Sequence, residues 1–269
     1  MALILVLAAF VATLAVLLFG PRYTAWRREH ARRAPFPEAW RAILRRNVAA
    51  YRTLPRERRA KLEELIRVFL AEKAFAGCAG QAIDDEVRLT IAAQACLLLL
   101  GRERGFFPRL TNVLVYPGAF LVERIRPEPS GILQEHRQVL TGESWTNGQV
   151  VLSWEDALAG GRIGDDGRNV VIHEFAHQLD QEKGYANGAP MGAARRSWAE
   201  AFSREYAVLQ QRAMMGEPTL IDPYGATAPE EFFAVASEVF FERPQALAEQ
   251  HPALYAELAR YYALDPRAW

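Results

Sequence analysis

Several features that mark large classes of protein are scarce or missing in this sequence of 269 residues. Two cysteines, Cys78 and Cys96, are too few for a disulfide framework. Basic and acidic residues number 32 each, so bulk attraction to nucleic acid is not expected. With 51% hydrophobic and 24% charged residues, the composition excludes disordered, collagen-like and coiled-coil proteins. The chain is long enough to bury a sizeable core.

Lysine is also scarce, because the chain has 3 lysines and 29 arginines, a bias that suggests a GC-rich bacterial source. The zero net charge hides an uneven distribution. Residues 21–60 contain 12 arginines and 3 glutamates, a net charge of +9, which leaves −9 for the rest of the chain. A basic segment of this kind is typical of a part of the chain that lies beside an anionic membrane surface.

The first 20 residues, MALILVLAAFVATLAVLLFG, contain no charged side chain and are long enough to span a bilayer as a helix. No basic residue precedes them, which disfavours the alternative of a cleaved signal peptide. The arginines that follow place the C-terminal side in the cytoplasm by the positive-inside rule. We therefore expect a single-pass transmembrane anchor in residues 1–20 and a basic juxtamembrane linker in residues 21–37. The expected location is the bacterial inner membrane, with the main domain facing the cytoplasm.

Residues 38–269 have the pattern of one α+β domain that is mostly helical and has a few strands in its middle. The segments TNVLVYP, AFLVERI and GQVVLSW predict short strands between about residues 111 and 154. Apolar periodicity and flanking proline and glycine residues predict helices over residues 38–52, 56–75, 84–100, 168–182, 193–214, 229–242 and 252–263.

One predicted helix contains the sequence HEFAH, from His173 to His177. Histidines four residues apart project from the same face of a helix and can bind one Zn²⁺. Glu174 is not well placed as a ligand but can reach a zinc-bound water. The neighbouring residues are mostly uncharged, as a helix buried behind a metal site requires. The alternative interpretation is two surface histidines on a helix.

A catalytic zinc site needs a third protein ligand and an open position for water. The remaining histidines, His30, His136 and His251, lie in segments without a supporting pattern, and no histidine follows the motif closely. A carboxylate is therefore the expected ligand. The apolar helix PEEFFAVASEVFFE offers Glu231 and Glu238, which are seven residues apart on one face. A carboxylate buried there needs a partner, which a metal ion would supply.

HEFAHQLD and the downstream segment IDPYGATAPEEFFAVASEVFF resemble the Mlc titration factor A (MtfA) family of zinc metallopeptidases. GQAIDDEVRLTIAAQACLLLLG, NVLVYP and ESWTNGQVVLSWEDA extend the resemblance over roughly residues 40–260. That family is related to the catalytic domain of anthrax lethal factor and belongs to the gluzincins. The resemblance thus implies a zincin-like fold and a glutamate as the third ligand. The family's tyrosine, seven residues before that glutamate, matches Tyr224 and Glu231 and leaves Glu230 and Glu238 as lesser candidates.

What the resemblance implies is a zinc-dependent peptidase in which His173, His177 and Glu231 hold one Zn²⁺. Glu174 would accept the proton of the zinc-bound water and pass it to the leaving amine. The Tyr224 hydroxyl would donate to the developing oxyanion. The expected partner is a peptide or protein substrate, and direct binding of nucleic acid is not expected.

Two further residues and one segment are candidates for contacts with a metal ligand or with the substrate. Asp180, three residues after His177, could orient a ligand imidazole, or it could be a solvated residue near the helix end. Glu238 is a second candidate for a contact behind a ligand. Residues Gln149–Trp154 form either an edge strand that pairs with an extended substrate or an interior strand of the sheet.

Two other classes of function remain open. The resemblance also allows a regulatory protein that binds and sequesters a transcriptional repressor similar to Mlc, with or without peptidase activity. A structural zinc module is the third interpretation. It has no need of Glu174, and such sites are usually closed by four protein ligands.

Overall fold

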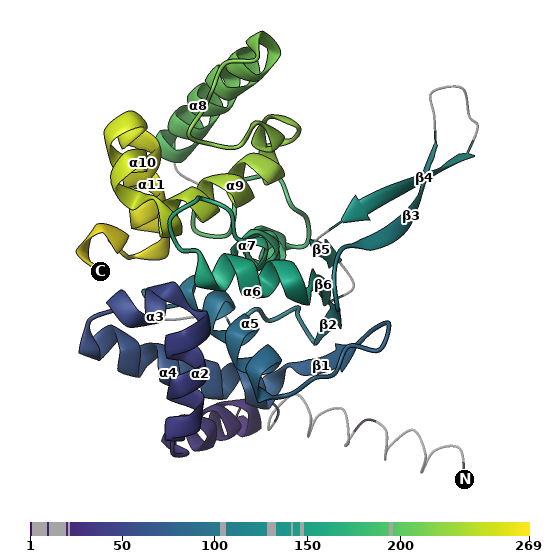
Figure 1. The fold of residues 1–269 in the computed structure, drawn as a ribbon, viewed down its shortest axis with the longest axis vertical. Helices are drawn as coiled ribbons and strands as arrows, with labels where there is room; N and C mark the ends of the chain where they lie inside the picture. Colours follow the sequence, from purple (N-terminus) through teal and green to yellow (C-terminus); the bar gives the residue numbers. More distant parts are fainter. Residues whose placement is uncertain are drawn as a thin grey trace.

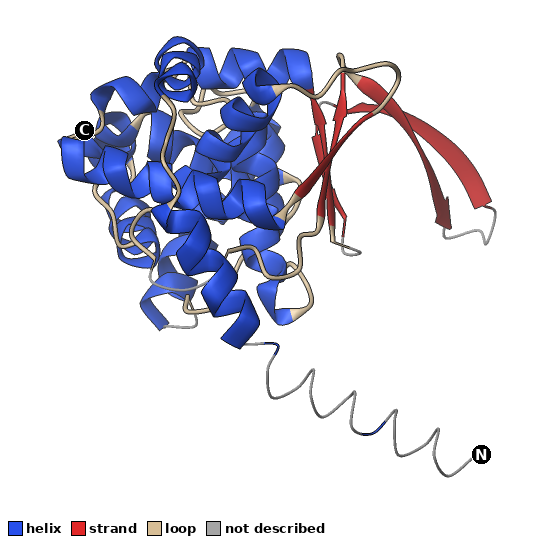
Figure 2. Ribbon diagram, turned by 90° about the horizontal axis from the view of Figure 1, so that it is seen from below, coloured by secondary structure: helices blue, strands red, loops and turns tan. Residues whose placement is uncertain are grey.

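The computed structural model describes residues 1, 10, 20, 22–102, 106–127, 133–140, 142–145, 148–193 and 196–269, and for 120–127, 133–140 and 143–145 it describes the backbone alone. Figures 1 and 2 show a helical body with a small sheet on one side, from which a two-stranded hairpin extends. Within the described ranges, no helix is both long and apolar enough to span a bilayer. The predicted anchor, residues 1–20, lies almost entirely outside those ranges.

Helices account for most of the described chain, so the predicted α+β, mostly helical class is confirmed. The helix expected over 38–52 is divided at Val48, whose backbone is extended. The helices have the bounds α2 Glu38–Asn47, α3 Ala49–Thr53, α4 Arg56–Glu72, α5 Asp85–Leu97, α6 Trp154–Arg162, α7 Val170–Asp180, α8 Arg196–Met215, α9 Pro229–Glu242, α10 Pro244–Gln250 and α11 Pro252–Tyr262, with 3-10 turns η1 Gln181–Lys183, η2 Pro223–Ala226 and η3 Pro266–Ala268.

The main sheet has the strand order β1-β2-β6-β5. β1 (Ala74–Gly77), β2 (Asn112–Tyr116) and β6 (Gln149–Ser153) are parallel, and β5 (Gly142–Trp145) pairs with β6 in the antiparallel direction. Of the two alternatives for Gln149–Trp154, the structure contradicts the edge strand and agrees with the interior strand, because β6 lies between β2 and β5. Its residues from Val150 onward are buried, as an interior strand requires.

The hairpin consists of β3 (Phe120–Pro127) and β4 (Leu133–Leu140), which pair from Phe120 opposite Leu140 to Pro127 opposite Leu133. It extends beyond the sheet without covering either face of the helical body (Figure 2). His136, one of the histidines considered as a ligand, lies within β4 opposite Arg124.

The helices α6 and α10 were not predicted, although both begin with recognisable signals. Ser153 ends β6 and also caps α6, since its side chain accepts a hydrogen bond from the Asp156 amide. Pro244 stands in the first turn of α10, where its missing N–H costs no hydrogen bond. A polar residue that both ends a strand and starts a helix is easily assigned to one element alone.

Residues 22–33, which were expected to belong to a linker, are helical and contact the body of the protein. Arg28 forms an ion pair with Glu72 at the end of α4, with a shortest N–O distance of 2.6 Å. The guanidinium groups of Arg28 and Arg32 also lie over the ring of Phe106. These contacts give the basic segment a defined position against α4.

Candidate metal centre

The helix α7 has one face in the core and one face at the site. Val171, Phe175 and Leu179 are fully buried, and the ring of Phe175 lies 4.8 Å from the ring centre of Phe107. These residues are four apart, so they form one apolar stripe along the helix. Their packing leaves His173 and His177 on the face directed towards α9. The orientation of the two histidines is thus set by apolar packing behind them.

Both ends of α7 are defined by local hydrogen bonds. The side chain of Asn169 occupies the N-cap and accepts a hydrogen bond from the Ile172 amide at 3.0 Å. At the other end, η1 closes at Gly184, whose positive φ of 110° suits glycine. The segment therefore begins and ends where its own sequence favours a boundary.

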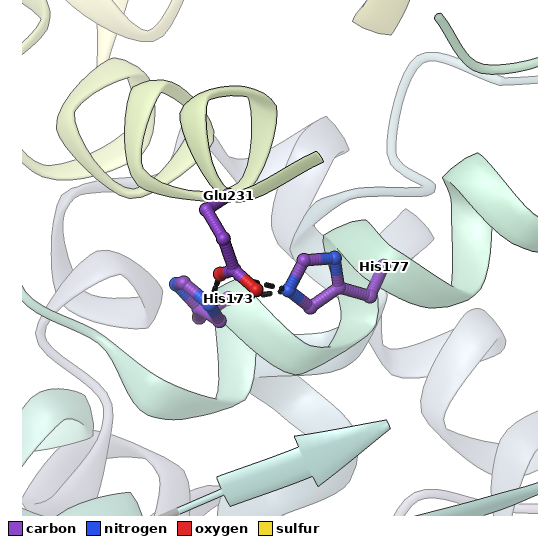
Figure 3. A group of neighbouring side chains, drawn as sticks. All are labelled: His173, His177 and Glu231. Atoms are coloured by element: carbon purple, nitrogen blue, oxygen red, sulfur yellow. Dashed lines mark hydrogen bonds and ion pairs between the residues drawn. The ribbon is translucent and has the colours of Figure 1, made fainter. Parts of the chain in front are cut away.

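Three side chains converge between α7 and α9 (Figure 3). The Nε2 atoms of His173 and His177 are 3.2 Å apart. The Oε2 atom of Glu231 lies 3.1 Å from Nε2 of His173 and 3.3 Å from Nε2 of His177. Ligands of a tetrahedral zinc ion at about 2.0–2.1 Å are about 3.3 Å from one another. The three donors therefore fit one divalent ion, and they are the metal-binding group found among the described residues.

The electrostatics of this group follow from burial and from its carboxylate. Burial lowers the pKa of His173, but hydrogen bonds to Glu231 and Glu238 outweigh it and raise this pKa well above its usual value. For Glu231, burial raises the pKa, whereas hydrogen bonds with His173 and His177 lower it well below its usual value. Glu231 is thus an anionic donor in a partly buried place, which favours a cation between the three side chains.

Behind His173, Glu238 takes the position that the sequence analysis considered for it. Its Oε1 atom lies 2.8 Å from Nδ1 of His173. A carboxylate on Nδ1 holds the proton there and leaves Nε2 free to bind a metal. The other oxygen of Glu238 accepts a hydrogen bond from the Asn169 amide at 2.5 Å. One glutamate thus connects α9 to both the ligand and the start of α7.

Glu242, which sequence reasoning missed, makes a third contact between the same two segments. Its Oε2 atom accepts hydrogen bonds from the amides of Gly167 and Arg168, and its Oε1 atom from the Asn169 side chain, each at 3.0 Å. Burial raises the pKa of Glu242 to about 9. Glu231, Glu238 and Glu242 are spaced by seven and four residues, a helical repeat that could have identified the third glutamate.

Glu174 lies next to the edge strand β5. Its side chain is buried, and a Cβ atom added at Gly142 would stand 2.6 Å from its Oε1. No side chain larger than hydrogen fits at Gly142 without displacing this carboxylate or Val170. No pattern in the sequence singles out Gly142, because its closeness to Glu174 depends on the position of β5 against α7.

Tyr224 is half-exposed and lies across from His173, with 6.0 Å between the ring centres. It belongs to η2, which is capped by Asp222 through a hydrogen bond from the Tyr224 amide at 2.9 Å. Asp222 also pairs with Arg168 at 2.8 Å. The structure therefore places the ring of Tyr224 beside His173, near the position that the resemblance to the MtfA family implied.

Asp180 and Glu230 are not members of the metal-binding group. Asp180 is fully buried, and its Oδ2 atom accepts hydrogen bonds from the amides of Asn187 and Gly188 at 2.7 Å. It thus holds the segment after α7, and the structure gives no hydrogen bond from it to His177. Glu230 is adjacent to Glu231 but outside the cluster.

His30 and His251 also lie elsewhere. The exposed ring of His30 stacks on Trp26. His251 precedes α11, and its Nδ1 atom lies 2.7 Å from a carboxylate oxygen of Glu205. Neither histidine takes part in the group formed by α7 and α9.

A cleft of about 510 Å³ opens over this site. Its walls include His173, Glu174, Tyr224 and Glu238, together with residues of α6. A second cavity of about 570 Å³ shares Gly160, Ile163 and Asn169 with this cleft but includes none of the predicted site residues. His173, Glu174 and Tyr224 therefore face the first cleft, whereas the other two members of the metal-binding group, His177 and Glu231, do not line it.

The donor set and the cleft are those of a metallopeptidase-type protein, and comparison with known proteins agrees. The chain belongs to the family of glucose-regulated metallo-peptidases M90, whose family model matches residues 23–263. This range includes the helix at 22–33 almost completely.

Named relatives cover most of the chain. An uncharacterized protein of Synechocystis sp. is 41% identical over 266 residues, which cover 97% of each chain. Mlc titration factor A of Cronobacter sakazakii is 33% identical over 247 residues, covering 90% of this chain and 91% of that protein. Mlc titration factor A of Klebsiella pneumoniae is 34% identical over 217 residues, covering 79% and 81%. The resemblance to the MtfA family is thereby confirmed.

Proposed function

We propose that this protein is a zinc-dependent peptidase of the zincin type, with His173, His177 and Glu231 as the metal ligands. The observation that carries the proposal is the spacing of the three donor atoms, which are 3.1 to 3.3 Å apart. Glu174 supports a catalytic rather than a structural site, because a carboxylate next to the first histidine is what a hydrolase needs as a general base.

The protein's own residues account for the proton movements. Glu174 accepts a proton from the attacking water and donates it to the leaving amine as the peptide bond breaks. Glu238 holds the proton on Nδ1 of His173 throughout. When bound, a zinc ion supplies Lewis acidity towards water and the peptide carbonyl. The Tyr224 hydroxyl is a second donor for the oxyanion that forms on the carbonyl oxygen.

The edge strand β5 suggests how a peptide would be held. It is the outer strand of the sheet next to β6, and its Gly142 lies against Glu174. An extended peptide that pairs with this edge would pass beside the catalytic carboxylate. We therefore propose that an extended substrate pairs with β5 and not with Gln149–Trp154.

A Glu174→Gln variant tests the proposed mechanism. The variant keeps the size of the side chain and removes the base, so zinc content should equal that of the wild type. Peptide hydrolysis should fall by about 10²- to 10⁴-fold. Glu230→Gln, next to the ligand but outside the metal-binding group, is the matched control and should retain activity. Full activity in Glu174→Gln would rule out the assigned role of Glu174.

We also infer that residues 1–20 anchor the protein in the bacterial inner membrane with the main domain in the cytoplasm. Their uncharged composition supports this, as does the following helix, where Tyr23 and Trp26 are 59% and 61% exposed. The full-length chain should remain in the membrane fraction after a high-salt wash, and a chain that starts at residue 22 should not. Recovery of the full-length chain in the soluble fraction would contradict the anchor.

A second candidate function is the binding of a transcriptional repressor, and the name of the relatives, Mlc titration factor A, favours it. The zinc-loaded Glu174→Gln variant is suited to this test because it cannot cleave a bound partner. Co-purification of a repressor with the variant from cytoplasmic extract would support binding. If no repressor co-purifies under conditions in which the wild-type protein hydrolyses peptides, peptidase activity remains as the function.

A further inference from the structure

One wall of the cleft is a regular face of α6. Asp156, Ala159, Gly160 and Ile163 all line the cleft, and their spacing of three, four and seven residues places them along one side of the helix. Asp156 stands in the first turn, Ile163 just beyond the last, and the two small residues lie between them. The face extends over about 10 Å at the rise of an α-helix.

The other carboxylates in the cleft already have partners. Glu238 bonds to His173 and Asn169, as described above. The Asp222 carboxylate pairs with the guanidinium group of Arg168 at 2.8 Å. Asp166, which also lines the cleft, accepts a hydrogen bond from the Arg168 amide at 2.9 Å.

Asp156 differs from these carboxylates. It is half-buried, and its backbone amide donates to Ser153, but no described side chain bonds or pairs with its carboxylate. Because a half-buried negative charge is most stable beside a cation, the cleft offers a place for a positive group at this end of α6.

The rest of the face suits an aliphatic chain. Ile163 is 47% exposed at the cleft, a large apolar side chain in contact with solvent. At position 160 a Cβ atom would stand 3.1 Å from the Asn169 Cα, so glycine lets α6 lie close to the start of α7. Lysine and arginine combine an aliphatic stem with a cationic end, and such side chains lay the stem on apolar surface while the charge reaches a polar partner.

We propose that the α6 face formed by Asp156, Ala159, Gly160 and Ile163 is a side-chain subsite that selects peptide substrates with lysine or arginine near the scissile bond. The stem lies over the exposed Ala159 and Ile163, and the cationic end pairs with Asp156. This subsite rests on the proposed peptidase function and gives it a substrate class.

A purely structural role for Asp156 makes a different prediction. Ser153 and Asp156 have the spacing of a capping box, and an acidic residue in the first turn stabilises a helix. Loss of that role would lower the melting temperature and reduce the hydrolysis of all peptides by the same factor. Loss of a subsite would affect only peptides that carry a cation.

The experiment compares matched peptides that place lysine or norleucine at each position around the scissile bond, since norleucine retains an aliphatic stem without the charge. Zinc-loaded wild-type protein should hydrolyse the best lysine peptide at least about tenfold faster in kcat/KM than its norleucine partner. Asp156→Asn should remove that preference and leave the norleucine rate within about twofold. Glu155→Gln, the exposed neighbour of Asp156, is the control and should behave as the wild type.

The outcomes separate the two proposals. Hydrolysis without a preference for lysine or arginine would overturn the subsite and leave the peptidase function standing. An equal loss on both peptides in Asp156→Asn, together with a lower melting temperature, would also overturn the subsite in favour of the helix cap. If the wild-type protein with zinc hydrolyses no peptide in the set, the proposed function fails and the subsite fails with it.

Discussion

Two helices of this protein, α5 and α9, are both surrounded by other elements but are built from different residues. In α5, the polar residues that are buried beyond the first turn are the uncharged Thr90 and Gln94. In α9, Glu238 and Glu242 are buried and Glu231 is half-buried. α9 also contains the half-buried Glu230 and the buried Ser237, and its other residues are apolar. Carboxylates in buried and half-buried places are therefore the main difference between the two helices.

The partners of these polar groups explain the difference. In α5 the amide of Gln94 donates to the carbonyl oxygens of Thr90 and Ala157, so the helix satisfies its polar side chain with backbone atoms. In α9, Glu231 and Glu238 reach the histidines of α7. A buried carboxylate costs several kcal/mol unless it is paired. Three carboxylates on one buried helix therefore indicate a function at that face, whereas α5 contributes to stability.

The largest effect should come from the carboxylate at the metal site. Glu231→Ala removes one of three donors, so zinc affinity should fall by more than about 100-fold, since loss of a partner behind a ligand alone costs about 10- to 100-fold. Competition with a chelating dye measures the affinity. Glu230→Ala is the matched control and should bind zinc as the wild type does. Unchanged zinc binding in Glu231→Ala would show that another residue is the third ligand.

An intermediate effect on zinc affinity is expected for Glu238, which contacts the ligand His173 from behind. Glu238→Gln keeps the shape of the side chain but removes the negative charge beside Nδ1 of His173. Zinc affinity should therefore fall by about 10- to 100-fold. Leu89→Ala in α5 should have the opposite effect, because it removes buried apolar volume from a helix that supplies no member of the metal-binding group. It should lower the free energy of unfolding by about 2–5 kcal/mol and leave zinc affinity unchanged. If both variants change zinc affinity equally, the contrast between α5 and α9 is wrong.

The smallest effect is expected for a buried charge that lies in neither α5 nor α9. Lys73 follows α4, and its ammonium group donates to the carbonyl oxygens of Phe107 at 2.8 Å and Leu110 at 2.9 Å. Burial lowers its pKa from 10.5 to about 8. Between those two values the unfolded chain binds the proton and the folded chain does not, so the contribution of Lys73 to stability rises with pH in this window.

Denaturant unfolding of the wild type and of Lys73→Met at several pH values tests this directly. From about pH 8 to pH 10, the stability of the wild type relative to the variant should increase by on the order of 1 to 2 kcal/mol. A stability difference that is constant or falls over this range would show that the lysine is not held in a site that disfavours its charge.

The sequence predicted the elements that depend on neighbouring residues. The bounds of α9 agree at Pro229 and Glu242, and α7 begins within two residues of the predicted start. β1 and α10 were missed because each is short and a few residues carry little periodic signal, whereas the longer α6 and β4 were missed as well. The choice between an edge and an interior position for Gln149–Trp154 stayed open for another reason, because an apolar strand has the same sequence pattern whether one neighbouring strand or two pair with it.

The residues of the site also divide into those predicted from local sequence and those placed by tertiary packing. The i, i+4 spacing determined that His173 and His177 share a face, because helix geometry is local. Glu231 is 58 residues from His173, and its choice over Glu238 rested on a family resemblance. The packing of α9 on α7 decided that Glu231 meets both histidines while Glu238 stands behind one of them. Contacts such as Gly142 against Glu174, or the α6 wall of the cleft, depend on how separate elements pack, and no local pattern encodes that arrangement.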